Sequence, residues 1–311
     1  MSEDSKSNET TQETAVSRRE FGAVSLAAGL AVVAGAGAAE AAERPLTETE
    51  VTVKTPDGNC DAVFIHPTTG TFPGVLIWPD AFGLRPAMRQ IGRRIASEGY
   101  AVLVPNPFYR TAKAPVFDTP SAFDFSNPAD TAKLPPLTGP LQAGGAAEKD
   151  AVAYVAFLDA QKEVDKVKKI GTQGYCMGGA LVVRTAAAAA DRIGAGASFH
   201  GGGLVTDNPN SPHLLVPKIK ARMYFGIAAN DDMRQPDAKD KLKAAFAAAN
   251  VPTEIEVYGS LHGWCVSDMP LQNGKPIYDM ADAERAWGKL VTLYKTALRL
   301  GLPHPEFSRL R

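Results

Sequence analysis

The stretch GTQGYCMGGAL, residues 171–181, places a cysteine in the middle of a glycine-rich run. Residues 174–178 fit the pattern G-x-nucleophile-x-G, in which small residues flank a side chain at a sharp turn. A strand is predicted before this turn, over residues 167–174, and a helix after it, over residues 179–191. Such a strand–turn–helix raises a nucleophile above the carboxyl edge of a sheet. We therefore expect Cys176 to be catalytic rather than a small buried core residue.

From residue 50 onward, the chain alternates short apolar runs with helical patterns. Two runs flank a Pro-Asp-Gly turn and predict an N-terminal hairpin. Beyond the hairpin and the cysteine stretch, strands are predicted at residues 74–78, 100–105, 195–199, 222–227 and 253–258, and helices at residues 85–97, 142–161, 238–249 and 281–298. This alternation predicts an α/β fold with a mostly parallel central sheet and helices on both faces. No composition break divides residues 50–305, so we expect residues 44–311 to form a single domain.

Residues 106–140 form a Pro-rich interval that has no predicted helix or strand. It contains seven prolines and five aromatic residues. A long irregular connection in a compact domain is usually a functional loop or lid. A surface excursion held by its own aromatic side chains is the alternative, and the sequence leaves both open.

Residues 1–43 have the composition of an export signal rather than of a folded domain. Paired arginines in SRREF precede a Gly/Ala-rich apolar run, which is similar to a twin-arginine signal. We expect cleavage near Ala42, export by the twin-arginine machinery and a periplasmic mature chain. An uncleaved membrane anchor is the alternative reading, whereas no segment of the mature chain is apolar enough to cross a membrane.

The composition excludes several other classes of function. The net charge is −1, which gives no electrostatic reason to expect nucleic acid as a partner. Three cysteines without C-x-x-C spacing predict neither a disulfide framework nor a zinc site. We expect no metal and no organic cofactor.

A cysteine nucleophile at such a turn needs a histidine base and a carboxylate to orient it, in the chain order nucleophile, acid, histidine. The segment AANDDMRQP follows a predicted strand and provides Asp231 and its rival Asp232. The segment LHGWC follows the next strand and provides His262. His200, at the end of another strand, is a secondary candidate for the pocket wall. Because the carboxyl ends of parallel strands meet at one edge of the sheet, we expect these groups to converge on Cys176.

Three motifs, GYCMGGAL, WPDAFGL and HGWCV, together resemble the dienelactone hydrolase family of α/β-hydrolases, whose members include carboxymethylenebutenolidases. The resemblance covers roughly residues 50–300 and implies an α/β-hydrolase fold. It implies that Cys176 is the nucleophile, His262 the base and an aspartate the third member of the triad. We favour Asp231 because AND at a strand end resembles members of the family, and Asp232 stays the rival because its spacing to Pro236 also suits the pattern.

The resemblance implies roles for two further segments of the site. Asp80 stands where family members carry a glutamate, one methylene longer, that orders the resting site and helps to create the thiolate. The main-chain N–H groups of Ala81 and Met177 form the oxyanion hole by the same resemblance. Two such donors stabilise the charge that develops on a carbonyl oxygen, each by about 3 kcal/mol. Phe82, Trp264 and the aromatic residues of the Pro-rich interval are candidates for an apolar pocket wall, and plain core packing is the alternative for each of them.

These observations predict a cysteine-dependent hydrolase of a small-molecule ester or lactone, acting through an acyl-thioester. The alternatives are a general carboxylesterase or thioesterase on the same site, and a non-catalytic or redox-responsive thiol protein on the same fold. The resemblance implies arginines that bind the lactone carboxylate, but no arginine lies between Arg110 and Arg184, and Val266 stands four residues after the histidine. The chemistry is therefore predicted more firmly than the ligand.

Overall fold

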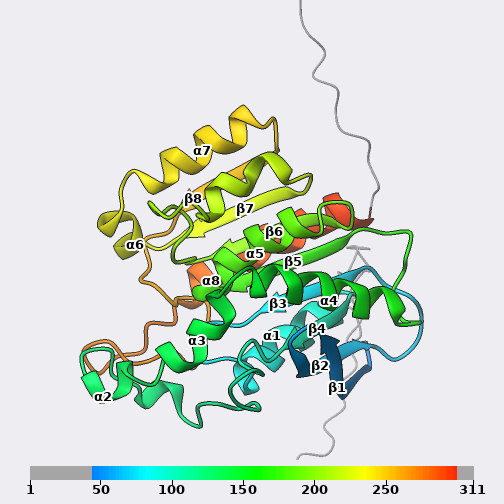
Figure 1. The fold of residues 1–311 in the computed structure, drawn as a ribbon, viewed down its shortest axis with the longest axis horizontal. Helices are drawn as coiled ribbons and strands as arrows, with labels where there is room; N and C mark the ends of the chain where they lie inside the picture. The colour runs from blue at the N-terminus through cyan, green and yellow to red at the C-terminus, as the bar shows by residue number, and fades with distance from the viewer. Residues whose placement is uncertain (1–43, 300–311) are drawn as a thin grey trace, which may run out of the picture. The chain divides into compact units, whose positions relative to one another are not determined.

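The computed structural model describes residues 44–299, so the predicted export signal, residues 1–43, lies outside the described residues and stays a prediction. Eight strands form one sheet in the order β1-β2-β4-β3-β5-β6-β7-β8 (Figure 1). Their bounds are β1 (Leu46–Thr55), β2 (Gly58–Pro67), β3 (Gly74–Trp78), β4 (Ala101–Pro105), β5 (Ile170–Tyr175), β6 (Ile193–Phe199), β7 (Arg222–Ile227) and β8 (Thr253–Val257).

The direction of the strands follows from their connections. The β1–β2 hairpin is antiparallel, and β2 pairs with β4 in the antiparallel sense. Every pair from β4 through β3, β5, β6 and β7 to β8 is parallel. The predicted α/β-hydrolase fold, with a mostly parallel sheet and an N-terminal hairpin, is therefore confirmed. All residues of β3, β4 and β5 are buried, as expected for parallel strands that are covered on both faces.

Five longer helices cover the two faces of the sheet. In Figure 1, α4 and α5 lie in front of the sheet and α1 and α8 behind it. Leu76 packs with residues of α4, α5 and α7 in one buried cluster, whereas Val75, its neighbour in β3, packs with residues of α1 and α8 in another. Successive strand residues point to opposite faces, so each face has its own core. The helices are α1 (Pro86–Ser97), α4 (Ala146–Ala160), α5 (Met177–Ala188), α7 (Ala238–Ala248) and α8 (Met280–Tyr294).

Short helices occupy parts of the chain for which irregular structure is predicted. Within residues 106–140 these are η1 (Pro120–Ala122), α2 (Pro128–Thr131) and the start of α3 (Pro135–Gln142), and farther along lie η2 (Pro212–Lys218) and α6 (Ala229–Arg234). Proline stands at the start of four of them, where its missing N–H costs no helical hydrogen bond. The expectation of a structureless interval is therefore wrong. The helix predicted from residue 142 begins instead at Ala146, because Gly144 and Gly145 have φ of 46° and 76°.

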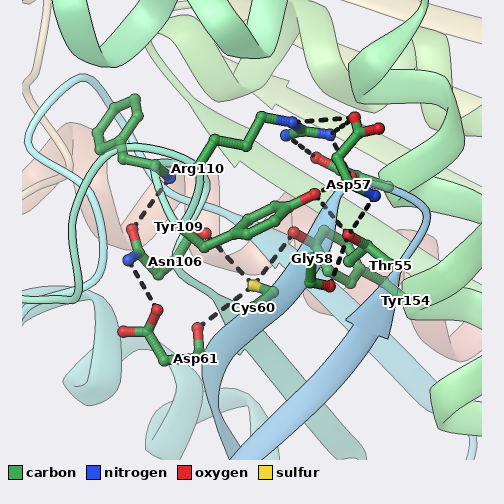
Figure 2. A network of polar contacts seen from close by, with 11 residues as sticks. Thr55, Asp57, Gly58, Cys60, Asp61, Asn106, Tyr109, Arg110 and Tyr154 are labelled. Carbon is green, nitrogen blue, oxygen red and sulfur yellow. Dashed lines mark hydrogen bonds and ion pairs between the residues drawn. The ribbon is translucent and has the colours of Figure 1, made fainter.

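A partly buried polar network fixes the start of this interval to the hairpin and to α4 (Figure 2). The Tyr109 hydroxyl lies 2.6 Å from Thr55 Oγ1 and donates to Asp150 Oδ1 at 2.8 Å. Arg110 pairs with Asp150 at 2.7 Å and with Asp57 at 2.6 Å. The first turn of the interval is thereby held at three points.

Within residues 44–299, no helix is both long enough and apolar enough to cross a bilayer.

Candidate active site

The turn that carries Cys176 has a backbone that only its glycine neighbours allow. Cys176 has φ 52° and ψ −115°, between the end of β5 and the start of α5. A Cβ atom on Gly174 would lie 2.2 Å from the carbonyl oxygen of Gly178, and a Cβ on Gly178 would lie 2.4 Å from that of Trp78. Neither position has room for a side chain. The G-x-C-x-G pattern therefore corresponds to a sharp turn, as predicted.

Cys176 stands at the N-terminal end of a helix, and its backbone is anchored on β6 and His200. The residue directly precedes α5, so the helix dipole and the first-turn N–H groups face it. Its own backbone N–H donates to the carbonyl oxygen of Phe199 and to Nδ1 of His200, both at 3.1 Å. The side chain is partly exposed, so a substrate carbonyl has access to it.

The structure brings His262 and Asp231 together. The distance from His262 Nδ1 to Asp231 Oδ2 is 2.6 Å. The backbone N–H of His262 donates to Asn230 Oδ1 at 2.8 Å, and Arg234 lies 3.3 Å from the other oxygen of Asp231. The short helix α6, directly after β7, thus holds both the position and the orientation of the imidazole.

The rival carboxylate turns away from the histidine. Both oxygens of Asp232 accept from Lys239 Nζ, at 2.7 and 2.9 Å. Lys239 belongs to α7, so Asp232 ties α6 to the next helix. Of the two candidates left open by the sequence, Asp231 is the one that contacts His262.

The charge state of His262 depends on its two partners. Burial disfavours the imidazolium, but hydrogen bonds to the side chains of Asp231 and Cys176 favour it and raise the pKa of His262 to about 10. The imidazole therefore lies between the carboxylate and the thiol. This is the arrangement in which a histidine takes a proton from a nucleophile and returns it later.

His200 lies directly beside this pair and is fully buried. Its ring centroid is 4.7 Å from that of His262 and 5.2 Å from that of Trp264. Burial, and then the charge of His262, lower the pKa of His200 well below its usual value, so it is neutral. His200 therefore packs against Cys176 and His262 as a buried neighbour and does not line the cleft.

Asp80 is fully buried and bonds to groups other than the thiol. Its two oxygens accept from Arg85 at 2.7 and 2.9 Å, and Oδ1 also accepts the backbone N–H of Phe82 at 2.9 Å. The other edge of the Arg85 guanidinium donates to Asp268 at 2.8 and 2.7 Å. Sequence reasoning missed Arg85 and Asp268. The only signal was an arginine placed just after the WPDAFGL motif, at the start of a predicted helix.

The two segments predicted to form the oxyanion hole lie close together. A Cβ on Gly178 would also lie 2.7 Å from the Pro79 carbonyl oxygen, so the first turn of α5 rests on the segment that leads to Ala81. Met177 is the first residue of α5, where N–H groups have no acceptor inside the helix.

A cleft of about 810 Å³ opens on Cys176. Its walls come from residues 141–148, from residues 176–184 at the start of α5 and from residues 202–215. The predicted aromatic wall is not found there. Phe82 and Trp264 are 1% and 0% exposed and belong to the core, and Phe117, Phe123 and Phe125 of the Pro-rich interval pack around Phe82. The cleft lies instead on the side of α5.

Among residues 44–299, no group of three or more His, Cys, Asp or Glu side chains is arranged to hold a metal ion. The three cysteines are all free, so no disulfide links Cys176 to Cys265.

Comparison with known proteins gives results that agree with this geometry. The model of the dienelactone hydrolase family matches residues 60–298. A relative from Synechocystis sp., provisionally named a carboxymethylenebutenolidase, is 25% identical and covers 74% of this chain and 88% of its own. A relative from Methylorubrum extorquens with the same provisional name is 26% identical over 86% and 90% of the two chains.

The solved structures agree with the fold. The structure of a provisionally named dienelactone hydrolase from Klebsiella pneumoniae superposes with a TM-score of 0.67 at 20% identity, covering 80% of this chain and 98% of that one. Since the family model spans most of the chain, the protein belongs to the dienelactone hydrolase family and is a hydrolase that acts on ester or lactone bonds.

Proposed function

We propose that this hydrolase uses a cysteine nucleophile, with Cys176, His262 and Asp231 as its triad. The observation that carries the proposal is the position of His262, whose Nδ1 lies 2.6 Å from Asp231 Oδ2 and whose pKa is raised by Asp231 as well as by the neighbouring Cys176 side chain. The nucleophile, base and orienting carboxylate each follow a strand of the parallel part of the sheet, namely β5, β8 and β7. The chain order is that of α/β-hydrolase triads, and the contact between the carboxylate and the imidazole is the geometry that acyl transfer needs.

In the first half of the reaction, the thiolate of Cys176 attacks the carbonyl carbon of the substrate. The N–H groups of Ala81 and Met177 hold the negative oxygen of the tetrahedral intermediate. When the intermediate collapses, the bond to the leaving oxygen breaks, and the imidazolium of His262 gives that oxygen its proton. The products of this half are an alcohol, or the ring-opened hydroxyl of a lactone, and an acyl-thioester on Cys176.

In the second half, water attacks the thioester carbon while neutral His262 takes one of its protons. The second intermediate expels the sulfur and releases the carboxylic acid. The His262 imidazolium and the Cys176 thiolate are thereby restored. Asp231 fixes the tautomer of the histidine and stabilises its cationic form in both halves.

Asp80 supports this chemistry through position. Its carboxylate fixes the backbone of Phe82, the residue after Ala81, and is itself fixed by Arg85. We assign Asp80 to holding the oxyanion-hole segment, and the glutamate-like role in thiolate formation is not needed for the steps above.

The test is the loss of turnover on removing the triad. With p-nitrophenyl acetate and dihydrocoumarin as the ester and lactone, Cys176→Ala and His262→Ala should each lower kcat/KM roughly a thousandfold or more. Cys265→Ala is the matched cysteine control and should retain activity. Circular dichroism checks that all variants are folded.

Equal turnover in wild type and Cys176→Ala would rule out the mechanism. Thioester substrates added to the same panel separate a lactonase from a thioesterase, because the triad itself serves both.

A further inference from the structure

The cleft that opens on Cys176 has a distinct far end, built around Arg184. Cys176, Ala180 and Arg184 are spaced by four residues and therefore share one face of α5. Arg184 follows Cys176 by eight residues, which corresponds to roughly 12 Å along the helix axis. A substrate whose carbonyl lies at Cys176 can therefore extend along this face toward the guanidinium.

The charge of Arg184 is already balanced. Its Nη1 lies 2.6 Å from Glu148 Oε1, and its Nη2 donates to the carbonyl oxygen of Asn210 at 2.8 Å. Glu148 lies in the first turn of α4 and Asn210 in the facing loop, so the guanidinium links both walls of the cleft. The side chains of Arg184 and Glu148 are 24% and 29% exposed. The ion pair is therefore partly shielded from water, and a ligand in the cleft can still reach it.

Among the residues that line the cleft, Arg184 and Glu148 are the only charged ones apart from the proposed thiolate of Cys176 at its near end. The remaining polar side chains are neutral hydrogen-bonding groups, namely Gln142, Thr206, Asn208, Asn210 and Ser211. Apolar side chains such as Leu181 and Leu215 complete the walls. The far end of the cleft is therefore polar and carries no net charge.

We propose that this cleft selects esters whose distal group is uncharged and hydrogen-bonding, such as an amide or a hydroxyl, over esters that carry a free carboxylate there. This rests on the proposed function of Cys176. A carboxylate at the far end meets the negative charge of Glu148 and has to displace it from Arg184. An amide bonds to the neutral side chains without breaking the ion pair. Glu148 thus discriminates by repulsion.

The experiment uses matched pairs of substrates with the full chain. p-Nitrophenyl monoesters of adipic and suberic acids are prepared with the far end either as a primary amide or as a free carboxylate. The readout is the ratio of kcat/KM for the amide to that for the carboxylate, which cancels general effects on the triad. In the wild type we expect this ratio to be roughly tenfold or more, the size of one charge-assisted hydrogen bond gained or lost.

Three variants test the origin of the ratio. Glu148→Gln releases Arg184 and should lower the ratio by about tenfold. Arg184→Gln removes the attraction and leaves Glu148, so it should keep the ratio at the wild-type value or raise it. Asp191→Asn makes the same change of charge on a side chain that is 88% exposed, just before β6, and should leave the ratio unchanged.

A wild-type preference for the carboxylate, or an equal ratio in wild type and Glu148→Gln, would overturn the inference while turnover still depends on Cys176. If neither ester is turned over, or if Cys176→Ala turns over both, the proposed function fails and the inference fails with it. Should Glu148→Gln not fold, the wild-type and Arg184→Gln ratios still decide the question.

Discussion

At the scale of single residues, the backbone of Cys176 is the feature on which the chemistry depends. A positive φ at a residue with a side chain is uncommon and is usually held in place by its surroundings. Here the hydrogen bonds of the Cys176 N–H to Phe199 and His200 hold it, and Gly174 and Gly178 leave it the necessary space. The strain is placed at the one side chain that has to be presented to a substrate.

The glycine before the nucleophile should accept no side chain. Gly174→Ala puts a methyl group 2.2 Å from the Gly178 oxygen, so we expect the free energy of unfolding to fall by about 3 kcal/mol. Gly139→Ala in α3 is the control, because an added Cβ there meets nothing within 4 Å. Urea denaturation measures both. Similar stability of the two variants would contradict the tight turn.

The protonation of His262 offers a second test at this scale. The pKa of about 10 means that the imidazole is cationic at neutral pH and loses its proton only in the alkaline range. The NMR shifts of the labelled imidazole should therefore titrate near pH 10. In Asp231→Asn the supporting carboxylate is absent, so the pKa should fall toward the ordinary value.

Asp232→Asn is the matched control for that titration, because this carboxylate pairs with Lys239. It should leave the His262 titration where it is. A fall of the pKa in Asp232→Asn, without one in Asp231→Asn, would exchange the roles of the two aspartates.

At the scale of elements, Arg85 joins two loops that each carry part of the site. It stands at the start of α1 and bonds to Asp80, after β3, and to Asp268, in the loop that follows His262. Its side chain is 1% exposed. The oxyanion-hole segment and the histidine loop are therefore fixed relative to each other by one buried guanidinium.

Removing that guanidinium should lower the free energy of unfolding far more than removing an exposed one. Arg85→Met leaves Asp80 as an unpaired buried carboxylate, and we expect a loss of about 3–5 kcal/mol in the free energy of unfolding. Arg93→Met is the control on the same helix, since its pair with Glu48 is half-exposed and worth under about 1 kcal/mol. Chemical denaturation compares the two. An equal effect would refute the role assigned to Arg85.

The choice between Asp231 and Asp232 shows what sequence reasoning lacks at this scale. Adjacent residues of a helix point about 100° apart, so only one of the two can face His262. Which one does depends on α6, a helix of six residues that is too short for a periodic pattern to reveal. Local sequence therefore identified the pair but did not separate its members.

At the scale of the whole molecule, the sheet was predictable and the cleft was not. Continuous apolar runs mark the buried strands, and each proposed triad member follows the end of one, so their convergence follows from parallel topology. The cleft is built instead from residues 141–148, α5 and residues 202–215, which meet only in the folded chain. The aromatic wall is absent from this cleft because the loop aromatics pack around Phe82 in a separate cluster.

The three thiols of this chain differ enough to be useful to an experimenter. Cys60 is 0% exposed, and burial, offset in part by a hydrogen bond from Tyr154, raises its pKa to about 12. Burial also raises the pKa of Cys265. Both therefore stay protonated at neutral pH, and Cys60 is in addition shielded from electrophiles by its burial. A chloroacetamide dye or an affinity tag should therefore attach to the sulfur of Cys176 alone. This gives a one-site label for imaging or capture without any engineered cysteine.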